Sequence, residues 1–274
     1  DALNAATICN NNTALGYLAL DAIVDNQHDA TAIGAFALSS ATDGTANVGV
    51  GCSAATALTG GSQITAIGFH AGKAITTGSR HTILGAYASR SITTANDTTA
   101  VGYNALRDNT TGTQNTALGD SCLYANTTGS YNTAVGHEAL KANTTGTRNN
   151  ALGYKALEAN TTGNYNCAFG NFALNANTTA ETNTAFGDYA CALNTTGAKL
   201  TGVGQNALYA NTTGNENTGI GYNALDANTT GSDNTALGSR ALGVNTTGYS
   251  HVAVGQDALA AITDGIRCTA VGQD

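Results

Sequence analysis

The side chains that most often carry out catalysis or bind metal ions are few and scattered. Six cysteines without a CxxC pair are spread over the chain: Cys9, Cys52, Cys122, Cys167, Cys191 and Cys268. Zinc sites and redox pairs need closely spaced cysteines or histidines, so this spacing disfavours both. We expect the cysteines to be small apolar filler in a buried interior.

The other reactive groups show no catalytic arrangement either. The histidines are His28, His70, His81, His137 and His251, and none has a serine or cysteine at a repeated spacing that would make a nucleophilic pair. Asp and Glu are dispersed, and no Gly-Lys-Ser/Thr follows the glycines to form a phosphate-binding loop. The sequence therefore predicts no catalytic residues, no metal site, no cofactor and no enzymatic activity.

Composition narrows the fold class and disfavours several partners. Only 10% of the 274 residues are charged, 42% are hydrophobic, and Pro, Met and Trp are absent. This argues against disorder and against a thick core of large side chains. The net charge is −8 with no basic cluster along the chain, so we expect no nucleic-acid partner. No apolar run is long enough to cross a bilayer, so we expect no membrane insertion.

An internal repeat explains how such a chain can be ordered. Counting back by 17 from Gly272 finds a glycine at every step to Gly34, and one step of 18 reaches Gly16. The sixteen repeats share the consensus N-T-A-[VIL]-G-x-x-A-L-x-x-N-T-T-G-x-x, in which apolar residues lack helical spacing. Two short strands and two turns fit each repeat. We predict an all-β fold: one β-solenoid domain over residues 1–274, with sixteen coils and no polar cap, belonging to a longer fibrous protein.

Two columns of the stacked repeat occupy alternate positions of one strand. The apolar column precedes the repeat glycine, and the strand Thr column lies two residues earlier, with Ala or Gly between them. Both columns share one strand face, which we expect to point inward. Replacing Val135 or Leu152 by Asp should then unfold several coils. The predicted core residues of the apolar column are Val101, Leu118, Val135, Leu152, Phe169, Phe186, Val203, Ile220, Leu237 and Val254.

Ala and Leu follow three and four residues after each repeat glycine, as Ala105 and Leu106 do. Neighbours on a strand point to opposite faces, so this pair indicates a corner. The Leu column contains Leu106, Leu123, Leu140, Leu157 and Leu174, and becomes Ala55, Gly72 and Ser89 in early repeats, which should pack differently. One thin coil could not enclose these leucines. We therefore expect them, or the apolar column, to pack against two further copies in a parallel homotrimer.

The Asn of the NTT segment exchanges with Ile or Leu in other repeats, which indicates an inward position. Stacked amides would form a hydrogen-bonded ladder, and Asn160→Ile should be tolerated. Each NTT is also an N-glycosylation sequon, which stays open as the alternative. The second glycine of the repeat, such as Gly112, should supply a positive φ. The NTT Asn column comprises Asn109, Asn126, Asn143, Asn160, Asn177, Asn194, Asn211, Asn228 and Asn245.

The first Thr of the NTT segment forms a further regular column. A line of hydroxyl and methyl groups at coil spacing is typical of ice-binding solenoids, so a monomeric ice-binding or ligand-presenting solenoid is the alternative function. The NTT Thr column comprises Thr110, Thr127, Thr144, Thr161, Thr178, Thr195, Thr212, Thr229 and Thr246.

The segment N-T-A-V-G at residues 132–136 resembles the repeat of trimeric autotransporter adhesin heads, and similar arrays occur in phage tail-fibre-like proteins. The resemblance covers the whole chain, although this repeat is longer than is usual in the heads, and their stalk and anchor are not in this sequence. It implies a left-handed β-roll, three parallel chains, and duty as an adhesive or structural fibre. We expect an extracellular, cell-surface or virion location. The expected partners are further copies of the chain, as a homotrimer or an end-to-end filament, and a cell-surface receptor or glycan.

Overall fold

The structure is a computed structural model that describes residues 8–23 and 25–273, without the side chains of residues 8, 9 and 25–27. It is an all-β parallel solenoid of about 15 turns of about 17 residues, as the sequence predicts. The chain divides into two compact units, Asp1–Val135 and Gly136–Asp274, and both are built from the same coil. The grouping of the whole chain into one domain stays a prediction.

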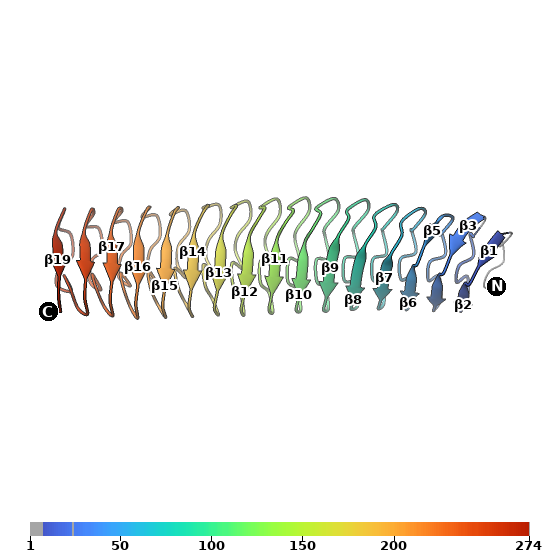
Figure 1. Ribbon diagram of the computed structural model, residues 1–274, viewed down its shortest axis with the longest axis horizontal. Coiled ribbons are helices and arrows are strands. Elements are labelled where there is room, and N and C mark those ends of the chain that lie inside the picture. Colours follow the sequence, from blue (N-terminus) through green and yellow to red (C-terminus); the bar gives the residue numbers. More distant parts are fainter. Residues whose placement is uncertain (1–7, 24, 274) are drawn as a thin grey trace. The chain divides into compact units, whose positions relative to one another are not determined.

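Each coil contributes a short strand to a parallel sheet, and the strands of each unit lie side by side (Figure 1). Successive strands pair in register, with Thr116 opposite Thr133 and Leu118 opposite Val135. In the first unit they are β2 (Thr13–Leu15), β4 (Thr31–Ile33), β6 (Val48–Val50), β7 (Ile64–Ile67), β8 (His81–Leu84), β9 (Thr98–Val101), β10 (Thr116–Leu118) and β11 (Thr133–Val135). In the second they are β12 (Asn150–Leu152), β13 (Cys167–Phe169), β14 (Thr184–Phe186), β15 (Thr201–Val203), β16 (Thr218–Ile220), β17 (Thr235–Leu237), β18 (Val252–Val254) and β19 (Thr269–Val271).

A second parallel sheet is confined to the early coils, where β1 (Ile8–Asn10), β3 (Asp25–His28) and β5 (Gly44–Thr45) pair. From β7 onward each described coil has one strand, so the prediction of two strands per coil is wrong there. The NTT segment still bonds coil to coil, because Thr110 N donates to Thr127 O at 2.9 Å.

The strand face that points inward is the one carrying Ala or Gly. Ala117 and Ala151 are buried, whereas Leu118, Leu152 and Phe186 on the opposite face are 46%, 47% and 52% exposed. The prediction that the apolar column forms the core is wrong, because residue size alone does not decide which face of a strand is buried. The exposed or half-buried members are Val101, Leu118, Val135, Leu152, Phe169, Phe186, Val203, Ile220, Leu237 and Val254.

The Leu column fills the interior from a corner of the coil. Ala105 and Leu106 are both fully buried, and Leu106 has a φ of 53°. This left-handed conformation turns two consecutive side chains to the same side, so the predicted corner is confirmed. The leucines at 106, 123, 140, 157 and 174 are enclosed by their own chain, which removes the argument for a trimer that rested on them.

Early coils fill the same volume with a different set of side chains. A Cβ added to Gly72 would lie 2.7 Å from Ile75 Cδ1 and 3.1 Å from Ile83 Cδ1. Ile75 and Ile83, both fully buried, therefore occupy the space that Leu takes in other coils. The prediction that early coils pack differently is confirmed.

The second glycine of the repeat serves a close approach between coils rather than a positive φ. Gly112 is not in the left-handed region, contrary to the prediction. A Cβ at Gly112 would lie 2.2 Å from Gly129 O and 2.6 Å from Asn109 Oδ1. By contrast, the repeat glycine Gly102 has a φ of 136°, so it meets both requirements.

Candidate functional site

The NTT Asn column is a buried amide ladder, as predicted. Asn160 Nδ2 donates to Asn143 Oδ1 at 2.9 Å and to Gly163 O at 3.1 Å, and Asn177 Nδ2 donates to Asn160 Oδ1 at 2.9 Å. An enclosed amide nitrogen leaves no room for a glycan in the folded chain, which counts against the sequon interpretation. All nine predicted members are fully buried: Asn109, Asn126, Asn143, Asn160, Asn177, Asn194, Asn211, Asn228 and Asn245.

A second amide column was missed by the sequence reasoning. The residue before the strand Thr is often Asn, and this strand Asn column is also buried. Asn115 Nδ2 donates to Gly129 O at 2.8 Å, and Asn115 Oδ1 accepts from Asn132 N at 2.9 Å. Its exchange with Ile64 and Leu200 was the available signal, since the same exchange marked the first ladder.

Two histidines stand in the strand Asn column. Each makes one of the hydrogen bonds that the Asn side-chain amide makes in other coils. His81 Nε2 lies 3.0 Å from Ala95 O, where other coils have an amide donor. His251 Nδ1 accepts a hydrogen bond from Cys268 N at 3.2 Å. Burial lowers the pKa of His81 to about 4, so this ring is neutral near pH 7. Both histidines are parts of the interior.

The NTT Thr column uses its hydroxyl hydrogens within the fold. Thr161 Oγ1 donates to Thr178 O at 3.0 Å, and Thr195 Oγ1 donates to Thr212 O at 3.0 Å. The hydroxyls therefore tie successive coils together instead of pointing to solvent. The half-buried members are Thr110, Thr127, Thr144, Thr161, Thr178, Thr195, Thr212, Thr229 and Thr246.

The most regular exposed surface is the outer strand face, formed by the strand Thr column and the apolar column. From β2 to β19, neither column contains a charged residue. Phe169 and Phe186 stack on it with their ring centroids 4.8 Å apart. In each unit this face is therefore uncharged and partly apolar.

A second exposed feature follows the repeat glycines. Phe69, Tyr87 and Tyr103 stand one or two residues after a repeat glycine in successive coils, and their rings contact edge to face. Beside them, Lys73, Arg90 and Arg107 occupy one column, five residues after the glycine. The expectation that the chain has no basic cluster is wrong, because residues 17 apart become neighbours when coils stack.

The described cysteines differ in burial, and Cys167 and Cys268 are half-buried. Cys122 and Cys191 are buried, and burial raises the pKa of each thiol to about 12, which fits the filler interpretation. Cys52 is exposed and does not fit it. The side chain of Cys9 lies outside the described residues.

The described part of the chain contains no group of three His, Cys, Asp or Glu side chains that could hold a metal ion. No helix in that same part is long and apolar enough to cross a membrane. In comparisons with known proteins, no family model and no curated protein matches the chain.

Proposed function

We propose that this solenoid is a structural and adhesive fibre segment that assembles as a parallel homotrimer through its outer strand face. The observation that carries the proposal is the uncharged strand face with exposed apolar side chains in each unit, such as Leu118 in the first unit and Leu152 in the second. Parallel copies of one sequence place the same residue types opposite each other in every coil, so a match made in one coil is repeated in all of them.

The strength of such an interface would grow with the number of coils. Roughly half of each exposed leucine is still in contact with water, and completing its burial stabilises by about 1 kcal/mol. Several coils together would reach the energy that a stable assembly needs, while a single coil would not.

The resemblance to trimeric adhesin heads and tail-fibre-like proteins supports the same assembly, including a left-handed coil. In an extracellular or virion fibre, the remaining surfaces of the coil would stay available for a receptor or glycan. Interiors built from repeated short side chains suit a spacer, because each coil adds length with the same contacts.

The alternative is a monomeric ice-binding solenoid. The NTT Thr column supports it poorly, because its hydroxyl hydrogens are donated to carbonyl groups of the next coil, as from Thr161 to Thr178. The strand Thr column keeps exposed members such as Thr116 and Thr235, so a flat ice-facing surface would have to be the outer strand face.

Analytical ultracentrifugation of the native chain and of Leu152→Asp tests the proposal. We expect a native mass of three chains, and a single folded chain for Leu152→Asp, because a charge on the outer strand face opposes association without entering the interior. Thr162→Asp adds the same charge at an exposed residue outside this face and should remain a trimer.

A native protein that stays a single chain at high concentration would contradict the trimer. If the same sample shows thermal hysteresis that Leu152→Asp abolishes, the ice-binding alternative is supported instead. Unfolding of Leu152→Asp would contradict the outward placement of the apolar column.

A further inference from the structure

A basic strip runs across three successive coils of the first unit. Lys73, Arg90 and Arg107 stand at the same repeat position, so their Cα atoms are separated by one coil, about 4.8 Å. Three of the chain's ten Lys and Arg residues thus gather in one column of a protein with a net charge of −8. Like charges at this spacing repel each other, so this column destabilises the fold. A function in binding would explain why the chain carries it.

The strip is incompletely neutralised. Arg107 is paired with Asp108, with Nε 2.8 Å from Oδ1. Lys73 and Arg90 have no carboxylate within ion-pair distance among the described residues. Burial, followed by the charges of Lys73 and Arg90, lowers the pKa of neighbouring His70. The site therefore keeps a positive charge available to a ligand.

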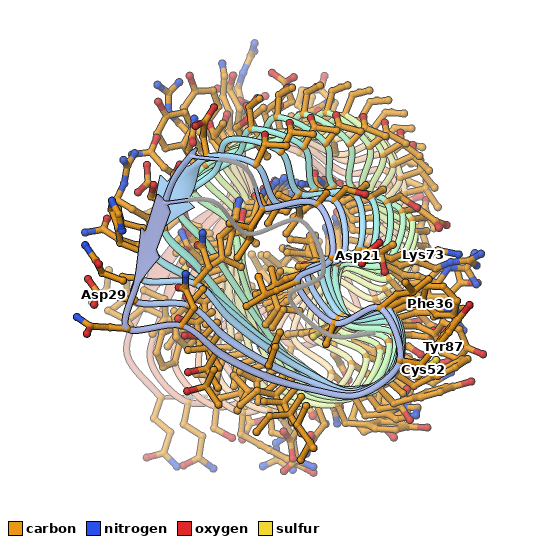
Figure 2. The ribbon with its side chains drawn as sticks, turned by 90° about the vertical axis from the view of Figure 1, so that its right-hand side faces the viewer. Asp21, Asp29, Phe36, Cys52, Lys73 and Tyr87 are labelled. Carbon is orange, nitrogen blue, oxygen red and sulfur yellow. The ribbon has the colours of Figure 1, made fainter. Side chains whose placement is uncertain are left out.

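Aromatic rings line the same side of the coil. Tyr87 and Tyr103 lie with ring centroids 6.1 Å apart, and the guanidinium carbon of Arg90 is 5.8 Å from the Tyr87 ring centroid. Tyr103 is 52% exposed, so a face or edge of its ring is open to a ligand. Lys73 and Tyr87 project from the same side of the unit, with Asp29 on the opposite side (Figure 2).

Two hollows meet at Arg90. One, of about 540 Å³, is lined by Ala57, Lys73, Ala74, Arg90 and Ser91. The other, of about 250 Å³, is lined by Tyr87, Arg90, Tyr103, Asn104 and Arg107. Each is lined by residues of successive coils, so an elongated ligand lying across the coils could contact both while a single small ion would occupy one.

We propose that the strip of Lys73, Arg90 and Arg107, with Tyr87 and Tyr103, is a binding site for an acidic polysaccharide that carries carboxylate or sulfate groups. Sugar rings would stack on the tyrosine faces, while their anionic groups pair with the cations and their hydroxyls bond with Asn104 and Ser91. This proposal rests on the adhesive part of the function proposed above and not on self-association.

Charge density favours a polysaccharide over a nucleic acid. Single-stranded nucleic acids also bind to aromatic rings and cations, but they carry a phosphate on every nucleotide. The strip offers three cations and one counter-charge, on a chain that is acidic elsewhere and therefore repels a densely charged polymer more strongly than a sparsely charged one. A polymer with one anionic group for every two sugars matches that limited charge.

Isothermal titration calorimetry of the full chain tests the site with four probes: hyaluronan hexasaccharide, chondroitin sulfate hexasaccharide, maltohexaose and hexathymidylate. We expect at least one acidic sugar to bind, more weakly as salt rises, with maltohexaose at least tenfold weaker. Hyaluronan carries only carboxylates, so its comparison with chondroitin sulfate shows whether sulfate is needed. Arg90→Gln and Tyr103→Ala should each weaken binding at least tenfold.

Arg80→Gln is the matched control, because Arg80 is exposed and ion-paired with Asp97 outside the strip. It should leave binding unchanged. Equal binding of maltohexaose, tighter binding of hexathymidylate, no binding of either acidic sugar, or full binding by Arg90→Gln would each overturn the site. Ultracentrifugation of the same samples separates the two proposals, because a chain that stays single and still binds refutes only the trimer.

Discussion

Replacing Asn160 by Ile tests whether the coil interior is filled by linked pairs of side chains. Ile stands at this repeat position in Ile75, but there the Leu column holds Gly72, and Ile75 Cδ1 occupies the space where a larger residue would begin. In the coil of Asn160 that space belongs to the fully buried Leu157. The sequence alone predicts that Asn160→Ile is tolerated. The structure instead predicts that it destabilises the fold.

The magnitude follows from the contacts of Asn160. Its amide makes three hydrogen bonds, to Asn143 Oδ1, Gly163 O and from Asn177 Nδ2. At about 1 kcal/mol for each bond, their loss costs roughly 3 kcal/mol. Leu20 and Ile23 stand at the same two repeat positions and are both fully buried, so one coil can hold both side chains, and overpacking against Leu157 adds only about 1 kcal/mol. Asn160→Ile should thus lower the free energy of unfolding by roughly 4 kcal/mol.

A second substitution separates the two contributions. Leu157→Gly alone leaves a cavity and should cost about 3–5 kcal/mol. Combined with Asn160→Ile, it recreates the Gly72 and Ile75 pair, so the isoleucine fills the cavity. We expect the double variant to be more stable than the sum of the single effects predicts, by at least about 2 kcal/mol.

Urea denaturation followed by far-ultraviolet circular dichroism measures all four proteins of this cycle. A stable Asn160→Ile variant would refute the linked packing, and so would additivity of the two single effects within about 0.5 kcal/mol. The ladder alone would be refuted if Asn160→Asp, which cannot donate to Gly163 O or Asn143 Oδ1 when ionised, were as stable as the native chain.

Three further substitutions have expected outcomes. Because burial lowers the pKa of His81 to about 4 while the unfolded ring titrates near 6.5, the folded state should lose about 3 kcal/mol as the pH falls from 6.5 to 4. His81→Asn keeps a donor to Ala95 O, and its free energy of unfolding, measured by urea denaturation at both pH values, should fall by less. An equal fall would show that His81 is not the cause. Thr182 has a φ of 63°, unfavourable for a β-branched residue, so Thr182→Asn should stabilise by roughly 1 kcal/mol in thermal unfolding, and a lower midpoint would contradict this. Thr161→Val removes the hydroxyl donor to Thr178 O and should cost about 1 kcal/mol, whereas unchanged stability would mean that the bond contributes nothing.

The 17-residue spacing predicted the coil and its parallel register, because equal spacing stacks equal residue types. It also predicted the NTT Asn ladder, since only an interior position accepts both Asn and Ile. The inward face of the strand was not predicted correctly. Ala and Val are both apolar, and residue size alone does not show which of them points inward. The restriction of the intervening position to Ala and Gly, with Ile83 as the exception, was the better indicator of confined space.

Features that depend on several repeats together were harder to predict. Arg90 and Arg107 look dispersed along the chain and become neighbours only when coils are stacked. The complementary sizes of Gly72 and Ile75 cannot be recognised from either column alone. The large residue in one column compensates for the small residue in the other.

The NTT Asn ladder of the second unit has a direction. From Asn160 to Asn245, each side-chain Nδ2 donates toward the preceding coil, and Asn245 Oδ1 is buried without a hydrogen-bond partner among the described residues, since Ile262 stands in the following coil. Amide dipoles that point the same way add, as peptide dipoles do in an α-helix. The interior of this unit therefore carries a macrodipole with its negative end near Asn245. Its two ends are therefore electrostatically different although the coils between them repeat.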